Sequence, residues 1–97
     1  MMMVVVAYDV DTCEAAGRRR LRQVGHECMK FGQRVQNSVF ECVVTPADRE
    51  LLKQRLMTLI DPQEDSLIMY DLGARYSRRI HYYGVRRHIP VDQVMML

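Results

Sequence analysis

The chain opens on an uncharged apolar stretch, Met1 to Ala7, that ends at the acidic residue Asp9. Its β-branched centre, Val4 to Val6, suits a strand, and the lack of polar alternation predicts burial on both faces. In open α/β sheets, ligands bind beyond the carboxyl ends of central strands. Asp9 is therefore a candidate functional carboxylate. The alternative is that Asp9, Asp11 or Thr12 caps the helix that follows.

Residues 12–31 show the three- and four-residue spacing of an amphipathic helix, with Gly32 as its expected C-cap. The predicted buried positions are Cys13, Gly17, Leu21, Val24, Cys28 and Phe31. Basic side chains follow the same spacing on the opposite face, with two further arginines beside them: Arg19, Arg22, His26 and Lys30, then Arg18 and Arg20. Arginine is the better bidentate phosphate ligand, which favours nucleic acid, but such a row is also typical of an ordinary solvated face.

The middle of the chain changes to the period of a strand and then returns to that of a helix. Residues 33–45 are either one bent strand or two strands joined by a turn at 37–38. Thr45 is the expected N-cap of a second helix and Pro46 its first residue. The predicted core face of this helix carries Leu52, Leu56 and Leu59, and a stop follows at Asp61 and Pro62.

A further apolar strand, Ser66 to Leu72, ends at Gly73. The order of strand, helix, strand region, helix and strand predicts an α+β fold, a ferredoxin-like βαββαβ sandwich over residues 1–84. After a basic connection, Ile80 to Tyr83 is expected to form a short additional strand. Residues 85–97 have an apolar end, and we expect them to pair as an extended segment at a sheet edge or a dimer interface.

Length and composition indicate a single domain. With 97 residues, 48% hydrophobic and 27% charged, the chain has a modest core, so we expect a homodimer. The apolar start is far too short to span a membrane and lacks a signal-peptide pattern, which predicts a cytoplasmic protein without membrane contact. Three cysteines without metal-ligand spacing are expected to stay reduced.

Motifs for chemistry are sparse. No Gly-rich phosphate loop, nucleophile elbow or zinc motif is present, and the histidines at 26, 81 and 88 lack ligand partners in the sequence pattern. Among the carboxylates, Asp9 has the best placement, whereas Glu41 and Asp71 lie within strand patterns. Because Mg²⁺ often needs one or two protein carboxylates, two copies of Asp9 across a two-fold axis could hold an ion.

Three features together closely resemble the CRISPR-associated protein two family: the strand that ends in Tyr8-Asp9-Val10, the Arg-rich helix, and the segment RVQNSVFE at residues 34–41. The resemblance spans nearly the whole chain. It implies ferredoxin-like homodimers that pair their sheets face to face, often exchange C-terminal strands, and capture spacer DNA with the CRISPR integrase subunit. Many members are also described as metal-dependent endoribonucleases or deoxyribonucleases.

The resemblance also assigns roles to individual residues. Asp9, preceded by Tyr8, corresponds to the catalytic aspartate and ligand of Mg²⁺ (or Mn²⁺). The helix arginines correspond best to Arg18 and Arg20, and Arg19 or Arg22 could substitute. The second motif contains Arg34, Ser38 and Phe40. Alternation with residues 42 and 44 independently predicts that Phe40 lies in the core.

The sequence supports two classes of function. The first is a nuclease in which Asp9 holds Mg²⁺ and arginines offset the phosphate charge. The second is a scaffold that presents a basic helix to DNA or RNA. The expected nucleic-acid contacts are Arg18, Arg19, Arg20, Arg22, His26, Lys30 and Arg34. We favour a CRISPR adaptation scaffold, for which the resemblance also implies metal-dependent endonuclease activity on RNA or DNA; a scaffold without catalysis is the alternative.

Overall fold

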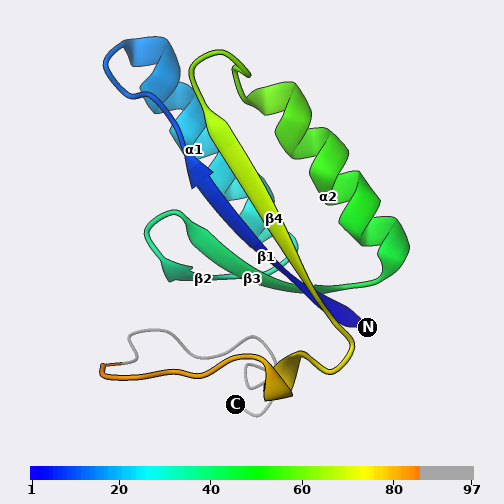
Figure 1. The fold of residues 1–97 in the computed structure, drawn as a ribbon. Helices are drawn as coiled ribbons and strands as arrows, with labels where there is room; N and C mark the ends of the chain where they lie inside the picture. The colour runs from blue at the N-terminus through cyan, green and yellow to red at the C-terminus, as the bar shows by residue number, and fades with distance from the viewer. Residues whose placement is uncertain (86–97) are drawn as a thin grey trace.

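The computed structural model describes residues 1–85 as an antiparallel sheet with two α-helices packed on one face (Figure 1). The strands are β1 (Met2–Asp9), β2 (Gln33–Gln36), β3 (Val39–Val44) and β4 (Ser66–Gly73). The helices are α1 (Ala15–Met29) and α2 (Pro46–Leu59), and a 3₁₀ turn, η1 (Tyr76–Arg78), follows β4. The strand order β2-β3-β1-β4 confirms the predicted βαββαβ sandwich.

The core lies between the sheet and the two helices. Alternate residues of β1 face the helices and are almost completely buried, among them Val4, Val6 and Tyr8. Phe40 is fully buried beside them, as the strand alternation predicts. The same cluster includes Val10, Val24, Cys28, Cys42, Val44, Leu52 and Leu56. Burial of this apolar surface is the main stabilising contribution to the fold.

Within residues 1–85, no α-helix packs on the opposite side of the sheet, which we call the open face (Figure 1). Val5 and Ala7 of β1 lie there and are half-buried, so the prediction that this strand is buried on both faces holds only at its start. Ile68 and Tyr70, their partners on β4, are 47% and 52% exposed. The open face is therefore an apolar surface that the described residues leave largely uncovered.

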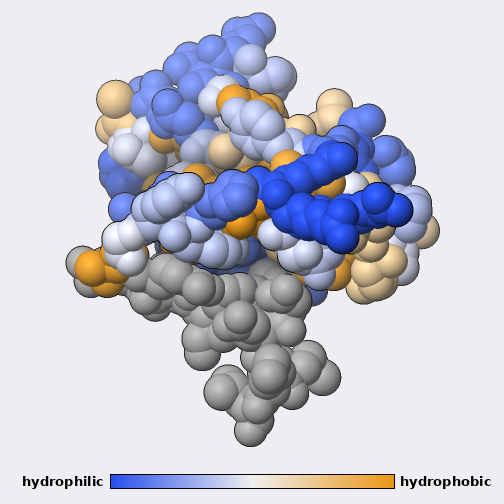
Figure 2. Space-filling view, turned by 60° about the horizontal axis from the view of Figure 1, so that its bottom comes forward, coloured by the Kyte–Doolittle hydropathy of each residue, from blue (hydrophilic) through white to orange (hydrophobic). Residues whose placement is uncertain are grey.

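The segment after β4 covers one part of the open face. Glu41 of β3 is only 4% exposed there, and both of its carboxylate oxygens accept from the Tyr82 hydroxyl at 2.8 Å. The segment is irregular, so the predicted strand at 80–83 is wrong. Its arginines, Arg75, Arg78 and Arg79, are exposed, and strongly hydrophilic side chains gather on this side of the molecule (Figure 2). The extended segment predicted for residues 85–97 lies, apart from residue 85, outside the residues that the structure describes.

Two element boundaries differ from the sequence prediction. Helix α1 starts at Ala15 rather than at residue 12, because the Asp11 side chain accepts from the Cys13 N–H at 2.9 Å and stabilises a turn before the helix. Cys13 is consequently exposed. Gly32 does not adopt the left-handed C-cap conformation. A Cβ there would lie 2.2 Å from the Glu41 carbonyl oxygen, so glycine is required for the close approach of β3.

Other local predictions are confirmed in the strand region and at the start of α2. A turn at 37–38 separates β2 from β3, which settles the alternative that the sequence left open. The Thr45 hydroxyl accepts from the Asp48 N–H at 3.1 Å, and Pro46 begins α2. The three cysteines form no disulfide. Within the described part of the chain, neither helix has the length and apolar character needed to cross a bilayer.

Candidate functional site

Asp9 is the last residue of the central strand β1 and pairs with Ser66 of β4. Its place in the alternation puts its side chain on the open face with Val5 and Ala7, and the residue is exposed. Helix α1 begins only at Ala15, so Asp9 is not its N-cap. The structure thus presents a solvent-accessible carboxylate at the end of a buried strand.

The backbone around Asp9 is held from both sides. On the side of β3, the Tyr8 N–H donates to the Ser38 carbonyl at 3.1 Å. On the side of β4, the Asp11 N–H donates to the Asp65 carboxylate, also at 3.1 Å. Ser38, a residue of the second motif, therefore holds the end of β1 through its backbone carbonyl.

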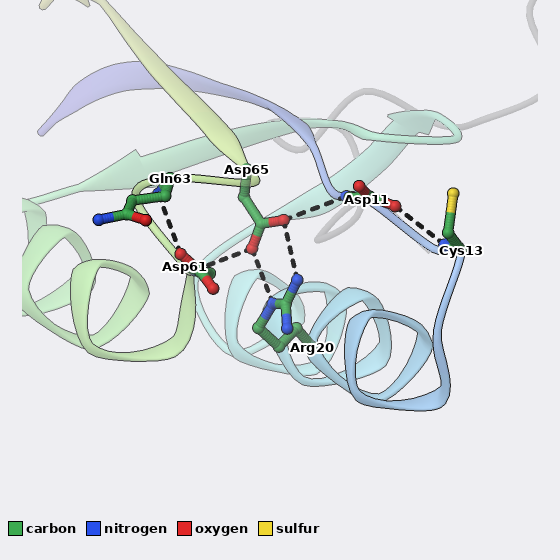
Figure 3. A network of polar contacts seen from close by, with 6 residues as sticks. All are labelled: Asp11, Cys13, Arg20, Asp61, Gln63 and Asp65. Atoms are coloured by element: carbon green, nitrogen blue, oxygen red, sulfur yellow. Dashed lines mark hydrogen bonds and ion pairs between the residues drawn. The ribbon is translucent and has the colours of Figure 1, made fainter.

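Asp65 is the centre of a polar network that the sequence did not indicate (Figure 3). Its side chain is fully buried and accepts from Arg20 Nε at 2.8 Å and Arg20 Nη2 at 3.2 Å. It also accepts from the Asp61 N–H at 2.8 Å. The Arg20 guanidinium, followed by the backbone donors, lowers the pKa of Asp65 to about 2. Arg20, expected to contact nucleic acid, is thus placed in an internal ion pair.

The second motif lies against the core. Tyr8 is 6% exposed and its ring stacks on Phe40 with a centroid distance of 6.3 Å. Burial raises the pKa of the Tyr8 hydroxyl. Arg34 lies on the edge strand β2, and its guanidinium is 5.1 Å from the centroid of the Phe40 ring. This geometry is typical of a cation–π contact. Tyr8 and Phe40 support the fold behind Asp9 and do not face solvent with it.

The exposed side of α1 carries the predicted basic row, Arg19, Arg22, His26 and Lys30, with Arg18 beside it. An acidic residue enters the row near its end, since Lys30 pairs with Glu27 at 3.1 Å and Glu27 also accepts from Arg55 at 2.7 Å. Arg18 donates to the Thr12 carbonyl at 3.1 Å. Within residues 1–85, Arg19, Arg22 and His26 have no ion-pair partner. These three side chains are available to an external anion.

The donor set at Asp9 is compatible with a hard divalent cation. Carboxylate oxygens are preferred ligands of Mg²⁺ and Mn²⁺, and Mg²⁺ keeps several waters when it binds one or two of them. No group of three or more His, Cys, Asp or Glu side chains converges on a common point in the described part of the chain. Asp9 therefore fits an ion held by few protein ligands, and does not form a closed cage.

Comparison with known proteins agrees with this architecture. Residues 2–80 match the family model described as CRISPR associated protein Cas2. The chain belongs to this family. The resemblance seen in the sequence is thereby confirmed.

Relatives and solved structures extend the match. The CRISPR-associated endoribonuclease Cas2 3 of Rhodospirillum rubrum is 50% identical over 95 residues, which cover 98% of this chain and 100% of that protein. The CRISPR-associated endonuclease Cas2 of Halalkalibacterium halodurans is 41% identical, with coverage of 98% and 99%. The crystal structure of Streptococcus pyogenes Cas2 at pH 6.5 superposes with a TM-score of 0.75 and 53% identity, over 86% of this chain and 100% of that one.

Proposed function

We propose that the protein is a dimeric nucleic-acid-binding scaffold for CRISPR spacer acquisition that works with the integrase subunit. The observation that carries the proposal is the exposed basic face of α1, where Arg19, Arg22 and His26 have no ion-pair partner among residues 1–85. Side chains at this helical spacing lie about 5–6 Å apart on one face. They can follow successive phosphates of a nucleic-acid backbone without reading its sequence.

The open face supports the dimer. It exposes Ile68 and Tyr70 beside half-buried residues of β1, and a second copy packed sheet to sheet would remove this apolar surface from water. Because α1 lies on the other side of the sheet, the two basic faces would point outward, away from the dimer axis. Such a dimer presents phosphate-binding surfaces on both sides.

We expect light scattering to give the mass of a dimer at micromolar concentration. Ile68→Lys should shift the mass toward that of a monomer, because it introduces a charge into the proposed contact. Met57→Lys is the matched control, since Met57 is 57% exposed but belongs to α2 on the other side of the sheet. A monomeric native protein would contradict the dimer.

Nucleic-acid binding has its own test. Replacing Arg19 and Arg22 by Ala should weaken duplex DNA binding equally for all sequences and reduce the salt slope by about one unit per lost phosphate contact. The control variant, Lys53→Ala, removes one charge from α2 without touching the ion pairs of α1, and it is compared with Arg19→Ala and Arg22→Ala made singly. Measuring the DNA affinity of each variant at several salt concentrations gives these slopes. An unchanged slope in the α1 variant would make the row ordinary solvated surface.

A second candidate function is metal-dependent phosphodiester hydrolysis at Asp9. The observation that favours it is the exposed carboxylate at the end of β1, and relatives named as endoribonuclease and endonuclease add support. A bound Mg²⁺ or Mn²⁺ ion would supply a water of lowered pKa and polarise the phosphate. Asp9 would hold the ion. Nuclease assays over a metal and pH series, comparing the native protein with identically prepared Asp9→Ala, test this candidate.

A further inference from the structure

We infer that Asp65 is a positioning residue for Asp9: its buried carboxylate fixes the exit of β1 and thereby the direction in which the Asp9 side chain points. The inference rests on the proposed hydrolysis at Asp9. It assigns Arg20 to the same task, as the counter-charge of Asp65 and not as a ligand of nucleic acid.

The first argument is location. Asp9 and Ser66 form the last pair of the antiparallel ladder between β1 and β4. Beyond that pair, the chain after Asp9 runs beside the chain before Ser66, and the bond from the Asp11 N–H to Asp65 Oδ1 joins them at 3.1 Å. Asp65 therefore continues the connection between the two strands immediately past Asp9.

The second argument is the number of segments that the carboxylate joins. Oδ1 accepts from the Asp11 N–H and from Arg20 Nη2, and Oδ2 accepts from Arg20 Nε and from the Asp61 N–H. These donors come from the β1–α1 turn, from α1 and from the α2–β4 turn (Figure 3). With a fully buried side chain, Asp65 cannot replace these partners with water.

The third argument concerns the opposite side of the turn. A Cβ on Gly17 of α1 would lie only 1.8 Å from the Asp11 carbonyl oxygen, so the helix backbone contacts the turn directly. The turn is thus held between α1 and Asp65. Within residues 1–85 the Asp9 carboxylate itself has no hydrogen-bond or ion-pair partner. Its orientation consequently depends on the backbone that Asp65 fixes.

The chain contains a matched control for the experiment. Arg49 donates to Asp71 of β4 through Nε at 3.0 Å and Nη2 at 2.8 Å, a two-point contact like that of Arg20 with Asp65. Asp71 lies farther along the strand, paired with Val4, and its ion pair does not reach the β1–α1 turn. Asp65→Asn and Asp71→Asn therefore make the same chemical change, near Asp9 and away from it.

The experiment has two readouts. In protein free of metal and nucleic acid, NMR hydrogen exchange at the Asp11 and Asp61 amides should accelerate about tenfold or more in Asp65→Asn and remain native-like in Asp71→Asn. With Mn²⁺ and a single-stranded RNA or duplex DNA substrate, Asp65→Asn should lower kcat about 10- to 100-fold. KM should stay within about twofold, because the basic face of α1 is unchanged. Asp65→Ala, which removes all four accepted bonds, should show larger changes at the same amides.

Three results would overturn the inference: native exchange at Asp11 in both Asp65 variants, native kcat despite faster exchange, or an equal loss of kcat in Asp71→Asn. Failure of the proposed hydrolysis gives a different pattern. If native protein and Asp9→Ala show the same activity, the positioning role falls together with the hydrolysis. The exchange rates then still establish whether Asp65 holds the turn, so the two failures are distinguishable.

Discussion

Asp9→Asn is expected to reduce metal-dependent hydrolysis about a hundredfold or more while leaving the fold intact. The substitution keeps the shape of the side chain and removes the charge that would hold Mg²⁺ or Mn²⁺. Loss of groups that only orient a metal ligand already costs about 10- to 100-fold, so losing the ligand itself should cost at least as much. Because the residue is exposed and outside the core, folding should be preserved.

The same substitution should change the response of the dimer to metal. Millimolar Mn²⁺ should raise the melting temperature of the native protein, since a ligand bound by the folded state stabilises it by mass action. If the dimer brings two Asp9 carboxylates together, Asp9→Asn removes their repulsion and should stabilise the metal-free dimer. Calorimetric titration with Mn²⁺ measures the binding, with Asp71→Asn, which is far from the β1–α1 turn, as the control. Native-like affinity in Asp9→Asn would place the ion elsewhere.

Phe40→Ala should lower the free energy of unfolding by about 3–5 kcal/mol, the usual cost of truncating a fully buried phenylalanine. The cavity would also remove the ring that stacks on Tyr8 and lies beneath the Arg34 guanidinium. Urea denaturation followed by circular dichroism measures the change. Any loss of nucleic-acid binding in this variant should follow its unfolding, because the ring is not accessible to a ligand.

Met57→Ala provides the comparison for Phe40→Ala. Met57 is 57% exposed on α2, so its truncation should change the unfolding free energy by less than about 1 kcal/mol. An equal destabilisation by the two substitutions would show that Phe40 is not a central core residue. Native binding by a folded Phe40→Ala protein would show that the second motif acts through structure alone.

Much of the fold follows from local patterns. The apolar run ending at Asp9 predicted the central strand, and the Thr45-Pro46 pair predicted the start of α2. Both predictions depend only on residues that are neighbours in the sequence. The wrong predictions involve competing contacts. The Asp11 side chain forms its own turn before α1, and the aromatic stretch near Tyr82 is drawn to Glu41, 41 residues away, instead of pairing as a strand. The spacing of residues along the chain gives no information about partners that are so far apart in the sequence.

The candidate site, too, was predicted only where its residues are marked by a local pattern. Asp9 was found from its position at a strand end, which is a local feature. Arg20 has the same sequence signal as its arginine neighbours, yet its partner Asp65 lies 45 residues away in what reads as a polar turn. Tertiary structure therefore separates arginines that the sequence pattern groups together: Arg20 is internal, whereas Arg19 and Arg22 remain accessible.

The distribution of the thiols has a practical consequence for studying this region. Burial raises the pKa values of Cys28 and Cys42 to about 12, so neither forms an appreciable thiolate at neutral pH. Cys13 is exposed in the β1–α1 turn, although its hydrogen bond to Asp11 raises its pKa as well. A maleimide probe applied at mildly alkaline pH thus has one accessible attachment point in the native fold. That attachment point lies beside Asp11, where a fluorophore can follow movements of the turn in real time.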